Sequence, residues 1–269
     1  MTTHTVTTAE IAARRTPPAG GFNLTALGLE IRRLLRNRRT VIFTMITPTV
    51  FFLLFGLNHA YATQSDGAGS HGNVSADILI SMSLYGAVIA TTAGGAMIAI
   101  ERSQGWSRQL RITPLSPMAY IAMKVMTAMV LSAVSVAVVN IVGALTGTPS
   151  MPLYVWASSA ASVWVGSLLF AAFGLFMGYL LPTENVMQIM GFVLMLLSFG
   201  GGLFIPLSTY PHLLQVLAKY TPLYGLNQLA HALIRGTSFD GWWALNVVAW
   251  LAIFVGGAVW RFRGDTARV

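Results

Sequence analysis

The sequence of 269 residues contains no cysteine and few charged side chains. Without cysteine the chain can form neither a disulfide nor a thiolate metal site. Asp, Glu, Lys and Arg make up 9% of the residues, whereas they make up about 25% of a soluble domain. Because 55% of the residues are hydrophobic, the composition predicts a membrane protein with several spans rather than a soluble domain on a single anchor.

The motifs of nucleotide-hydrolysing and hydrolytic enzymes are also absent. The chain has no GxxxxGK[ST] phosphate loop, since neither of its two lysines, Lys124 and Lys219, stands in that context. It has no HExxH or GxSxG site either. His59 and His71 have no carboxylates or cysteines clustered with them in the sequence, so we expect no metal site. The sequence therefore predicts a chain that is not an enzyme and binds no cofactor itself.

Ionisable residues are scarce inside the apolar runs. Asp77 and Glu101 lie at the ends of such runs, and Lys124 lies near the start of one, where its amine can reach the membrane interface. A carrier driven by protons needs a buried Asp, Glu or His to bind the ion. If this protein moves a substrate uphill, we therefore expect the energy to come from another subunit.

Six apolar runs are long enough to cross a membrane, which takes about 20 residues at 1.5 Å each. We expect one all-α membrane domain over residues 40–262. Pro48 should kink the first span, with neighbouring helices satisfying the backbone that it frees. Small residues at 91–97, and Gly174 with Gly178, predict close helix packing, and a dimer seam at the latter pair stays an alternative. The spans are about 40–57, 77–100, 119–145, 153–181, 186–203 and 242–260.

The basic residues indicate how these spans are oriented. The net charge is +8, and the arginines cluster at the ends of apolar runs, which is typical of membrane topology and not of nucleic-acid binding. The short basic loop 101–117 belongs on the cytoplasmic side. We expect a short helix in this loop over 103–112, and Ser116-Pro117 should open the third span. Both termini then lie in the cytoplasm, with tails at 1–21, expected to be disordered, and at 263–269.

Residues 22–39 predict an amphipathic helix that lies at the membrane surface, since leucines recur at helical spacing between arginines. The alternative is an arginine cluster that only fixes the topology. The residues that define this helix are Leu27, Ile31, Arg32, Arg33, Leu34 and Arg36.

The segment 204–241 is interrupted by prolines and predicts one or two half-buried helices at the outer membrane surface. Before it, Gly200, Gly201, Gly202 and Pro206 either end a helix or form a hinge at an outer gate. The fifth span is rich in methionine and phenylalanine, which either pack in the core or give an adaptable apolar lining for a lipophilic substrate. These candidate lining residues are Met187, Met190, Phe192, Met195 and Phe199.

Glu101-Arg102, Gly105, Leu110 and the run Thr113-Pro114-Leu115-Ser116 resemble the cytoplasmic loop of ABC-2 type transporter permeases. The amphipathic basic helix, the six spans and the proline-rich segment before the last span extend the resemblance over residues 22–262. It is strongest to bacterial drug- and antibiotic-resistance permeases of the daunorubicin-exporter type, which implies a multi-pass protein of the bacterial inner membrane.

The resemblance implies partners. Two permease subunits, copies or paralogues, would pair within the membrane lipid and dock two copies of an ABC ATP-binding subunit that carries ATP and Mg. Loop 101–117 would be the coupling helix, with Glu101 as its acidic anchor. The implied contact residues are Glu101, Arg102, Gly105, Trp106, Arg108, Leu110, Arg111 and Pro114.

The sequence thus favours the permease of an ATP-driven exporter for a drug, an antibiotic or a lipid-like compound. Two other classes stay open: a carrier or channel driven by an ion gradient, and a membrane assembly protein that transports nothing. We expect no nucleic-acid partner.

Overall fold

The computed structural model describes residues 21–65, 67, 69–104, 116–181 and 186–266, and the regular elements of these residues are helices. One isolated bridge, Ser65 to Asn73, is the exception. The predicted all-α fold is therefore confirmed. The helices are α2 (Leu24–Arg36), α3 (Arg38–Gly56), α4 (His59–Thr63), α5 (Val74–Ser103), α7 (Pro117–Thr146), α8 (Leu153–Gly166), α9 (Leu168–Leu180), α10 (Val186–Gly200), η3 (Leu207–Thr209), α11 (His212–Ala218), α12 (Pro222–His231) and α13 (Gly241–Thr266).

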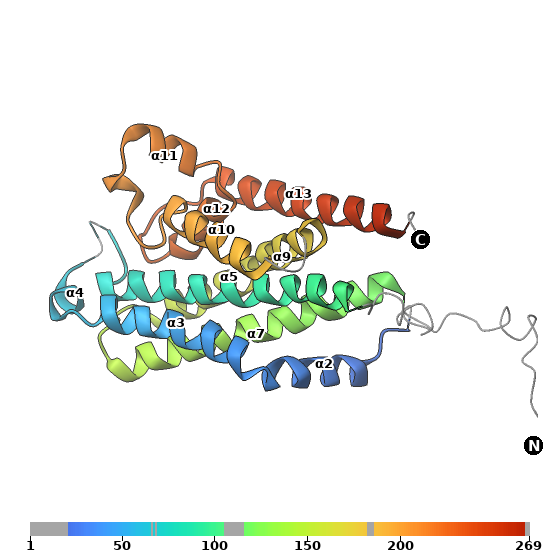
Figure 1. Cartoon of the computed structure of the whole chain (residues 1–269). Helices are drawn as coiled ribbons and strands as arrows, with labels where there is room; N and C mark the ends of the chain where they lie inside the picture. The colour runs from blue at the N-terminus through green and yellow to red at the C-terminus, as the bar shows by residue number, and fades with distance from the viewer. Residues whose placement is uncertain (1–20, 66, 68, 105–115, 182–185, 267–269) are drawn as a thin grey trace, which may run out of the picture.

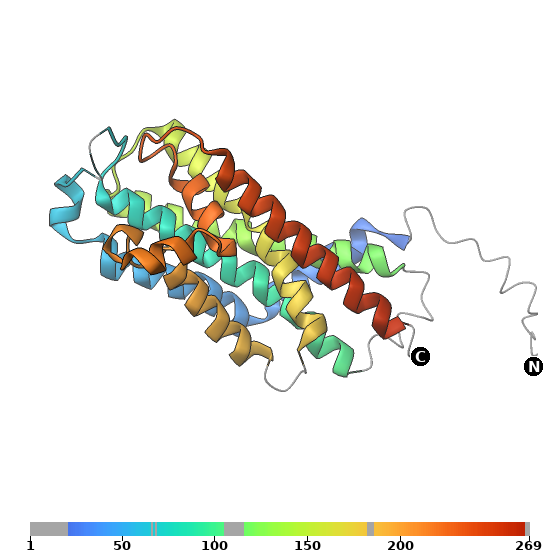
Figure 2. The same ribbon diagram turned by 90° about the horizontal axis from the view of Figure 1, so that it is seen from above.

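The long helices lie lengthwise in one bundle around α5 (Figures 1 and 2). α5 packs against α3, α7, α8, α9, α10 and α12, and its residues Leu79, Leu84 and Ala87 are fully buried. The start of α2, the end of α5, the start of α7 and the end of α13 lie together at one end of the bundle, here called the basic end (Figure 1). α4 and the turn between α7 and α8 lie at the opposite, distal end.

Four helical segments are long and apolar enough by themselves to cross a membrane. They are Val74–Arg102, Met118–Thr146, Leu153–Leu180, in which α8 and α9 meet at Ser167, and Gly241–Phe262. α2 and α3, which meet at 62°, add a fifth span if the bent pair counts as one. α10 has 15 residues and is shorter than a full span. The structure thus supports four or five of the six expected spans, and the number six stays a prediction.

The predicted close packing of small residues is confirmed between α5 and its neighbours. A Cβ atom added to Gly95 would lie 2.4 Å from the carbonyl carbon of Gly174 on α9, and one added to Gly178 would lie 2.8 Å from the carbonyl oxygen of Gly95. A Cβ atom added to Gly94 would lie 2.6 Å from Cβ of Ala128 on α7. The Gly174–Gly178 face is covered by α5 of the same chain, so it is not a seam between subunits.

Two predictions about helix geometry are also confirmed. Pro48 stands inside α3, and the hydroxyl of Ser135 on α7 bonds the carbonyl oxygen of Thr44, four residues before the proline. Ser116 caps α7, since its Oγ accepts the backbone N–H of Ala119, with proline in the first turn after it. A neighbouring helix thus satisfies the carbonyl group that the proline leaves free, and Ser116 with Pro117 opens α7, as predicted, whereas the kink at Pro48 stays a prediction.

The proline-rich segment differs in part from the prediction. Pro206, Pro211 and Pro222 begin η3, α11 and α12, as expected. α11 is exposed, but α12 is almost completely buried against α5, α8, α10 and α13. In place of the expected half-buried helices, the segment thus contains one exposed helix, α11, and one enclosed helix, α12. α12 is enclosed because it folds back into the bundle and fills the space beside α5.

Candidate functional site

The site begins with α2, the amphipathic helix at the start of the described chain. Its first turn is capped by Asn23, whose Oδ1 accepts the backbone N–H of Thr25 at 2.8 Å. Leu27 is the buried residue of this helix, which packs on α7 and α3. Asn37 ends α2 and caps α3 through the N–H of Thr40. α2 therefore meets α3 at an angle and lies across the basic end of α7.

Beneath α2 lies a cluster of charged side chains from three helices. Glu101 of α5 is 4% exposed. Its Oε1 lies 2.6 Å from Nζ of Lys124 on α7 and 3.0 Å from Nη1 of Arg33 on α2, while the hydroxyl of Tyr120 donates to Oε2. Lys124 also bonds Glu30 of α2. We call these five residues the ion-pair cluster.

The cluster corrects the prediction that Lys124 reaches the membrane interface. The lysine is buried, and its ammonium group points at Glu101 and Glu30. A buried ammonium group is costly unless carboxylates and hydrogen bonds compensate it. Two carboxylates supply that compensation here, so the amine turns inward. Glu30 was missed in the sequence because it lies on the arginine-rich helix as a single acid.

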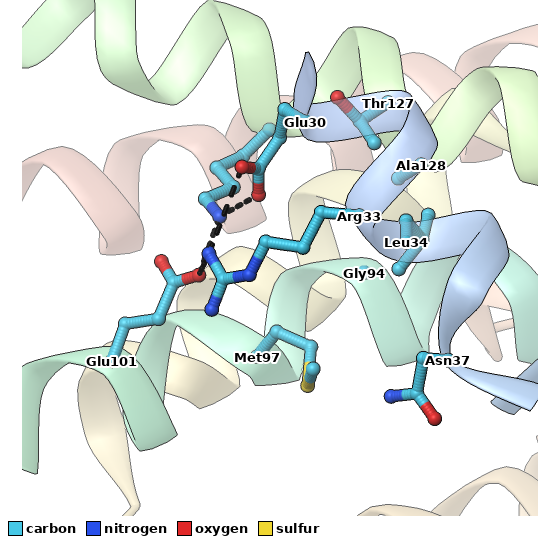
Figure 3. Close-up of a pocket in the computed structure, with 10 residues that line it drawn as sticks. Glu30, Arg33, Leu34, Asn37, Gly94, Met97, Glu101, Thr127 and Ala128 are labelled. Atoms are coloured by element: carbon cyan, nitrogen blue, oxygen red, sulfur yellow. Dashed lines mark hydrogen bonds and ion pairs between the residues drawn. The ribbon is translucent and has the colours of Figure 1, made fainter. Parts of the chain in front are cut away.

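A cavity of about 210 Å³ opens beside the cluster, between α2, α5 and α7. Figure 3 shows Arg33 and Glu30 reaching from α2 towards Glu101 of α5. Lys124 also lines the cavity, and the rest of the lining is uncharged. It consists of Leu34, Asn37, Gly94, Met97, Thr127 and Ala128. The cavity thus has a charged end and a less polar end.

The last turn of α5 is also attached to α9. Arg102 donates to the carbonyl oxygens of Gly178 and Tyr179, at 3.3 and 3.2 Å, and its guanidinium lies 5.2 Å from the centre of the Tyr179 ring. Glu101 and Arg102 therefore connect this one turn to α2 and α7 on one side and to α9 on the other.

The other residues predicted for coupling lie outside the described part of the chain: Gly105, Trp106, Arg108, Leu110, Arg111 and Pro114. So does most of the helix expected at 103–112. The residues of the amphipathic helix are described. Leu27 is buried, Ile31 and Leu34 are half-buried, and Arg32, Arg33 and Arg36 are exposed. Leu27, Ile31 and Leu34 thus form the more buried side of α2, and Leu34 also lines the cavity, whereas Leu24 and Leu35 are exposed. The position of this helix at a membrane surface stays a prediction.

The candidate lining residues of α10 divide into two groups. Met190 is buried in the core of this chain. Met187, Phe192, Met195 and Phe199 are exposed. At 100° per residue these four fall on one side of the helix. Their use as a lining for a substrate stays a prediction.

The glycine segment ends α10. Gly202 has φ +77°, a conformation that favours glycine. The buried side chain of Asn227 on α12 donates to the carbonyl oxygen of Gly201 at 2.9 Å. Gly200 is the last helical residue, and Pro206 precedes η3. The segment is therefore a helix end tied to α12, and its use as a hinge stays a prediction.

A second polar group at the distal end was missed in the sequence. Nε and Nη2 of Arg235 both contact Oδ1 of Asp77, at 3.1 and 2.9 Å. His231 is fully buried; its Nδ1 lies 2.8 Å from the carbonyl oxygen of Asn227, and its Nε2 lies 3.2 Å from Oγ of Ser81. These contacts fasten α12 to α5. The sequence did contain a signal for this contact, because an acid, Asp77, and an arginine, Arg235, were predicted to lie on the same side of the membrane.

Comparison with known proteins shows which family this chain matches. Residues 24–234 match the model of the family described as "ABC-2 type transporter". The chain is also similar to "Putative transport permease YvfS" of Bacillus subtilis (strain 168), with 28% identity over 229 residues, which cover 84% of this chain and 91% of the relative. The match includes α2, the ion-pair cluster and α12.

Proposed function

The chain belongs to the ABC-2 type transporter family, and we propose that it is the subunit through which an ATP-driven exporter moves a lipophilic compound out of the cytoplasm or the inner leaflet. As a member of that family it is a multi-pass membrane permease of an ABC transporter, a transport subunit rather than an enzyme. The direction, the substrate and the partners are the proposal.

The proposed topology has six spans in a bacterial inner membrane, with both termini in the cytoplasm. α3 and α10 are the two spans beyond the four long helical segments. The start of α2 and the end of α13 lie at the same end of the bundle, which supports an even number of crossings (Figure 1). This basic end carries most of the arginines, as the cytoplasmic side of a membrane protein does.

The energy would come from an ABC ATP-binding subunit, present in two copies and carrying ATP and Mg. It would dock beneath loop 101–117. The observation that carries this proposal is the contact of Glu101 with Lys124 and Arg33, next to that loop. Because this contact joins α5 to α7 and α2, a push on the loop would move the helices on either side of the cavity together.

A second permease subunit, a copy or a paralogue, would complete the pathway. The exposed apolar side of α10 supports this proposal, since Phe192 and Met195 face away from the chain's own core. Between two subunits they would form an apolar and adaptable wall for a lipophilic substrate.

The test is ATP-dependent uptake into inverted membrane vesicles that contain the chain and its ATP-binding subunit. Glu101→Gln and Arg108→Ala should each abolish most of the uptake while the protein still inserts, and the purified chain alone should hydrolyse no ATP. Full uptake by both variants would contradict the coupling role. Uptake into liposomes driven by an ion gradient, with no ATP-binding subunit present, would favour a carrier instead.

A further inference from the structure

We propose that the cavity between α2, α5 and α7 binds the charged group of a lipophilic monovalent cation, and that Arg33 occupies this place when no ligand is bound. The inference rests on the proposed export of lipophilic compounds and names the class of substrate. The ligand would carry a single positive charge, as an amine or a quaternary centre, on an apolar body.

The charges that line the cavity define this class. Glu30 and Glu101 are negative, and Lys124 and Arg33 are positive, so the four groups balance. With the guanidinium of Arg33 withdrawn, two carboxylates face one ammonium group, and the cavity holds one net negative charge. A monovalent cation restores the balance, whereas an anion would add to the negative charge and a neutral compound would leave it uncompensated.

Arg33 is the cation that can leave. Its side chain is 52% exposed, whereas that of Lys124 is 8% exposed. Nη1 of Arg33 lies 3.0 Å from Glu101 and 3.6 Å from Glu30. The buried carboxylate of Glu101 keeps Lys124 and Tyr120 as partners when the half-exposed guanidinium withdraws, so this step leaves no buried charge unpaired. Removing the buried Lys124 would instead leave two carboxylates without their main partner.

The lining away from the charges fits the apolar body of such a ligand. Leu34, Met97 and Ala128 supply apolar surface there, beside the polar side chains of Asn37 and Thr127. Methionine adapts to ligands of different shape because its side chain is unbranched and polarisable. The cavity, at about 210 Å³, is much larger than the roughly 10–15 Å³ that one water molecule needs. It therefore has room for a ligand group between α2 and α5.

The test is equilibrium binding of radiolabelled tetraphenylphosphonium to the purified chain in lipid nanodiscs. Arg33→Ala should tighten binding by about fivefold, because the resident competitor is gone. Glu30→Gln should weaken it by about tenfold, because the vacated cavity is then neutral. Arg36→Ala is the matched control: this arginine is exposed on the same helix and does not line the cavity, so its removal should change the affinity by less than about twofold.

Binding that is unchanged or weaker in Arg33→Ala would overturn the proposal. So would an equal gain in Arg36→Ala, since that would show a general effect of surface charge, or binding of neutral triphenylphosphine oxide as tight as that of the cation. Glu30 and Arg33 are partly exposed, so both variants should fold, which size-exclusion chromatography checks. The assay contains no ATP-binding subunit. A negative result there leaves the exporter proposal intact, and failure of ATP-dependent uptake leaves the binding result intact.

Discussion

The hydroxyl of Ser135 on α7 donates a hydrogen bond to the carbonyl oxygen of Thr44 on α3 at 2.9 Å. In an unbroken helix that oxygen would accept the N–H of the residue four positions later, which here is Pro48 and has none. Pro48 also packs against α5, since a Cβ atom added to Gly86 would lie 2.9 Å from Cγ of the proline. α7 thus satisfies the backbone group that the proline in α3 leaves free.

Ser135→Ala should therefore destabilise the protein by about 1–3 kcal/mol, because a buried carbonyl oxygen loses its donor. Unfolding in mixed micelles with increasing denaturing detergent would measure the loss. Ser158→Ala is the control, since the hydroxyl of Ser158 bonds carbonyl groups of its own helix, and it should have little effect. Adding Pro48→Ala should recover part of the loss by restoring the N–H donor, and no recovery would argue against this explanation.

Gly95→Ala should separate α5 from α9. The new methyl group would meet the backbone of α9 at 2.4 Å, which side-chain motion cannot relieve. We expect a loss of about 1–3 kcal/mol or more, as for other overpacked cores. Gly191→Ala on α10 is the control, because nothing lies within 4 Å of its added Cβ atom, and it should be neutral or slightly stabilising. Equal thermal stability of the two variants would contradict the close contact.

Lys124→Met should cost about 3–5 kcal/mol, since it leaves the carboxylate of Glu101 buried without its main partner. Combining it with Glu101→Gln should cost less than the two single losses together, because neither charge is then left unpaired. A double-mutant cycle measures this coupling. Lys219→Met, at an exposed site, should change stability little. Additive losses would show that the two charges act independently.

Asp77→Asn should loosen α12, since it weakens the two contacts with Arg235 at the distal end. The chain has no cysteine of its own, so a single Ala230→Cys substitution reports opening at a buried position of α12. We expect its labelling rate to rise by about tenfold or more, as for the loss of a hydrogen bond to a charged group. Asp240→Asn, at an exposed acid outside this group, is the control and should leave the labelling rate unchanged. An unchanged labelling rate in both variants would show that the contact between Asp77 and Arg235 does not hold α12 against α5.

The proposed topology predicts opposite accessibility for two introduced cysteines. In intact cells, Ser107→Cys in the basic loop should resist a membrane-impermeant maleimide, and His59→Cys at the start of α4 should react. Both should react after the membrane is permeabilised. Labelling of the Ser107→Cys variant from outside would reverse the orientation and end the coupling proposal.

The sequence predicted the features that depend on local chemistry. Ser116 and Pro117 specify a helix start wherever they stand together before an apolar run, and Pro206, Pro211 and Pro222 interrupt helices because each lacks a backbone N–H. The amphipathic helix at residues 24–36 follows in the same way from the spacing of its leucines. These inferences need no knowledge of which helix lies beside which.

Only the tertiary structure decided the contacts that make the site. Lys124 turns inward because two acids from two other helices, Glu30 and Glu101, meet it there. His231 is buried because α12 folds back against α5. Hydrophobic periodicity reports which face of a helix avoids water, but not what covers that face. In a chain with so few charges, the partner of each buried charge depends on how the helices cross, and that is set by packing between residues far apart in the sequence.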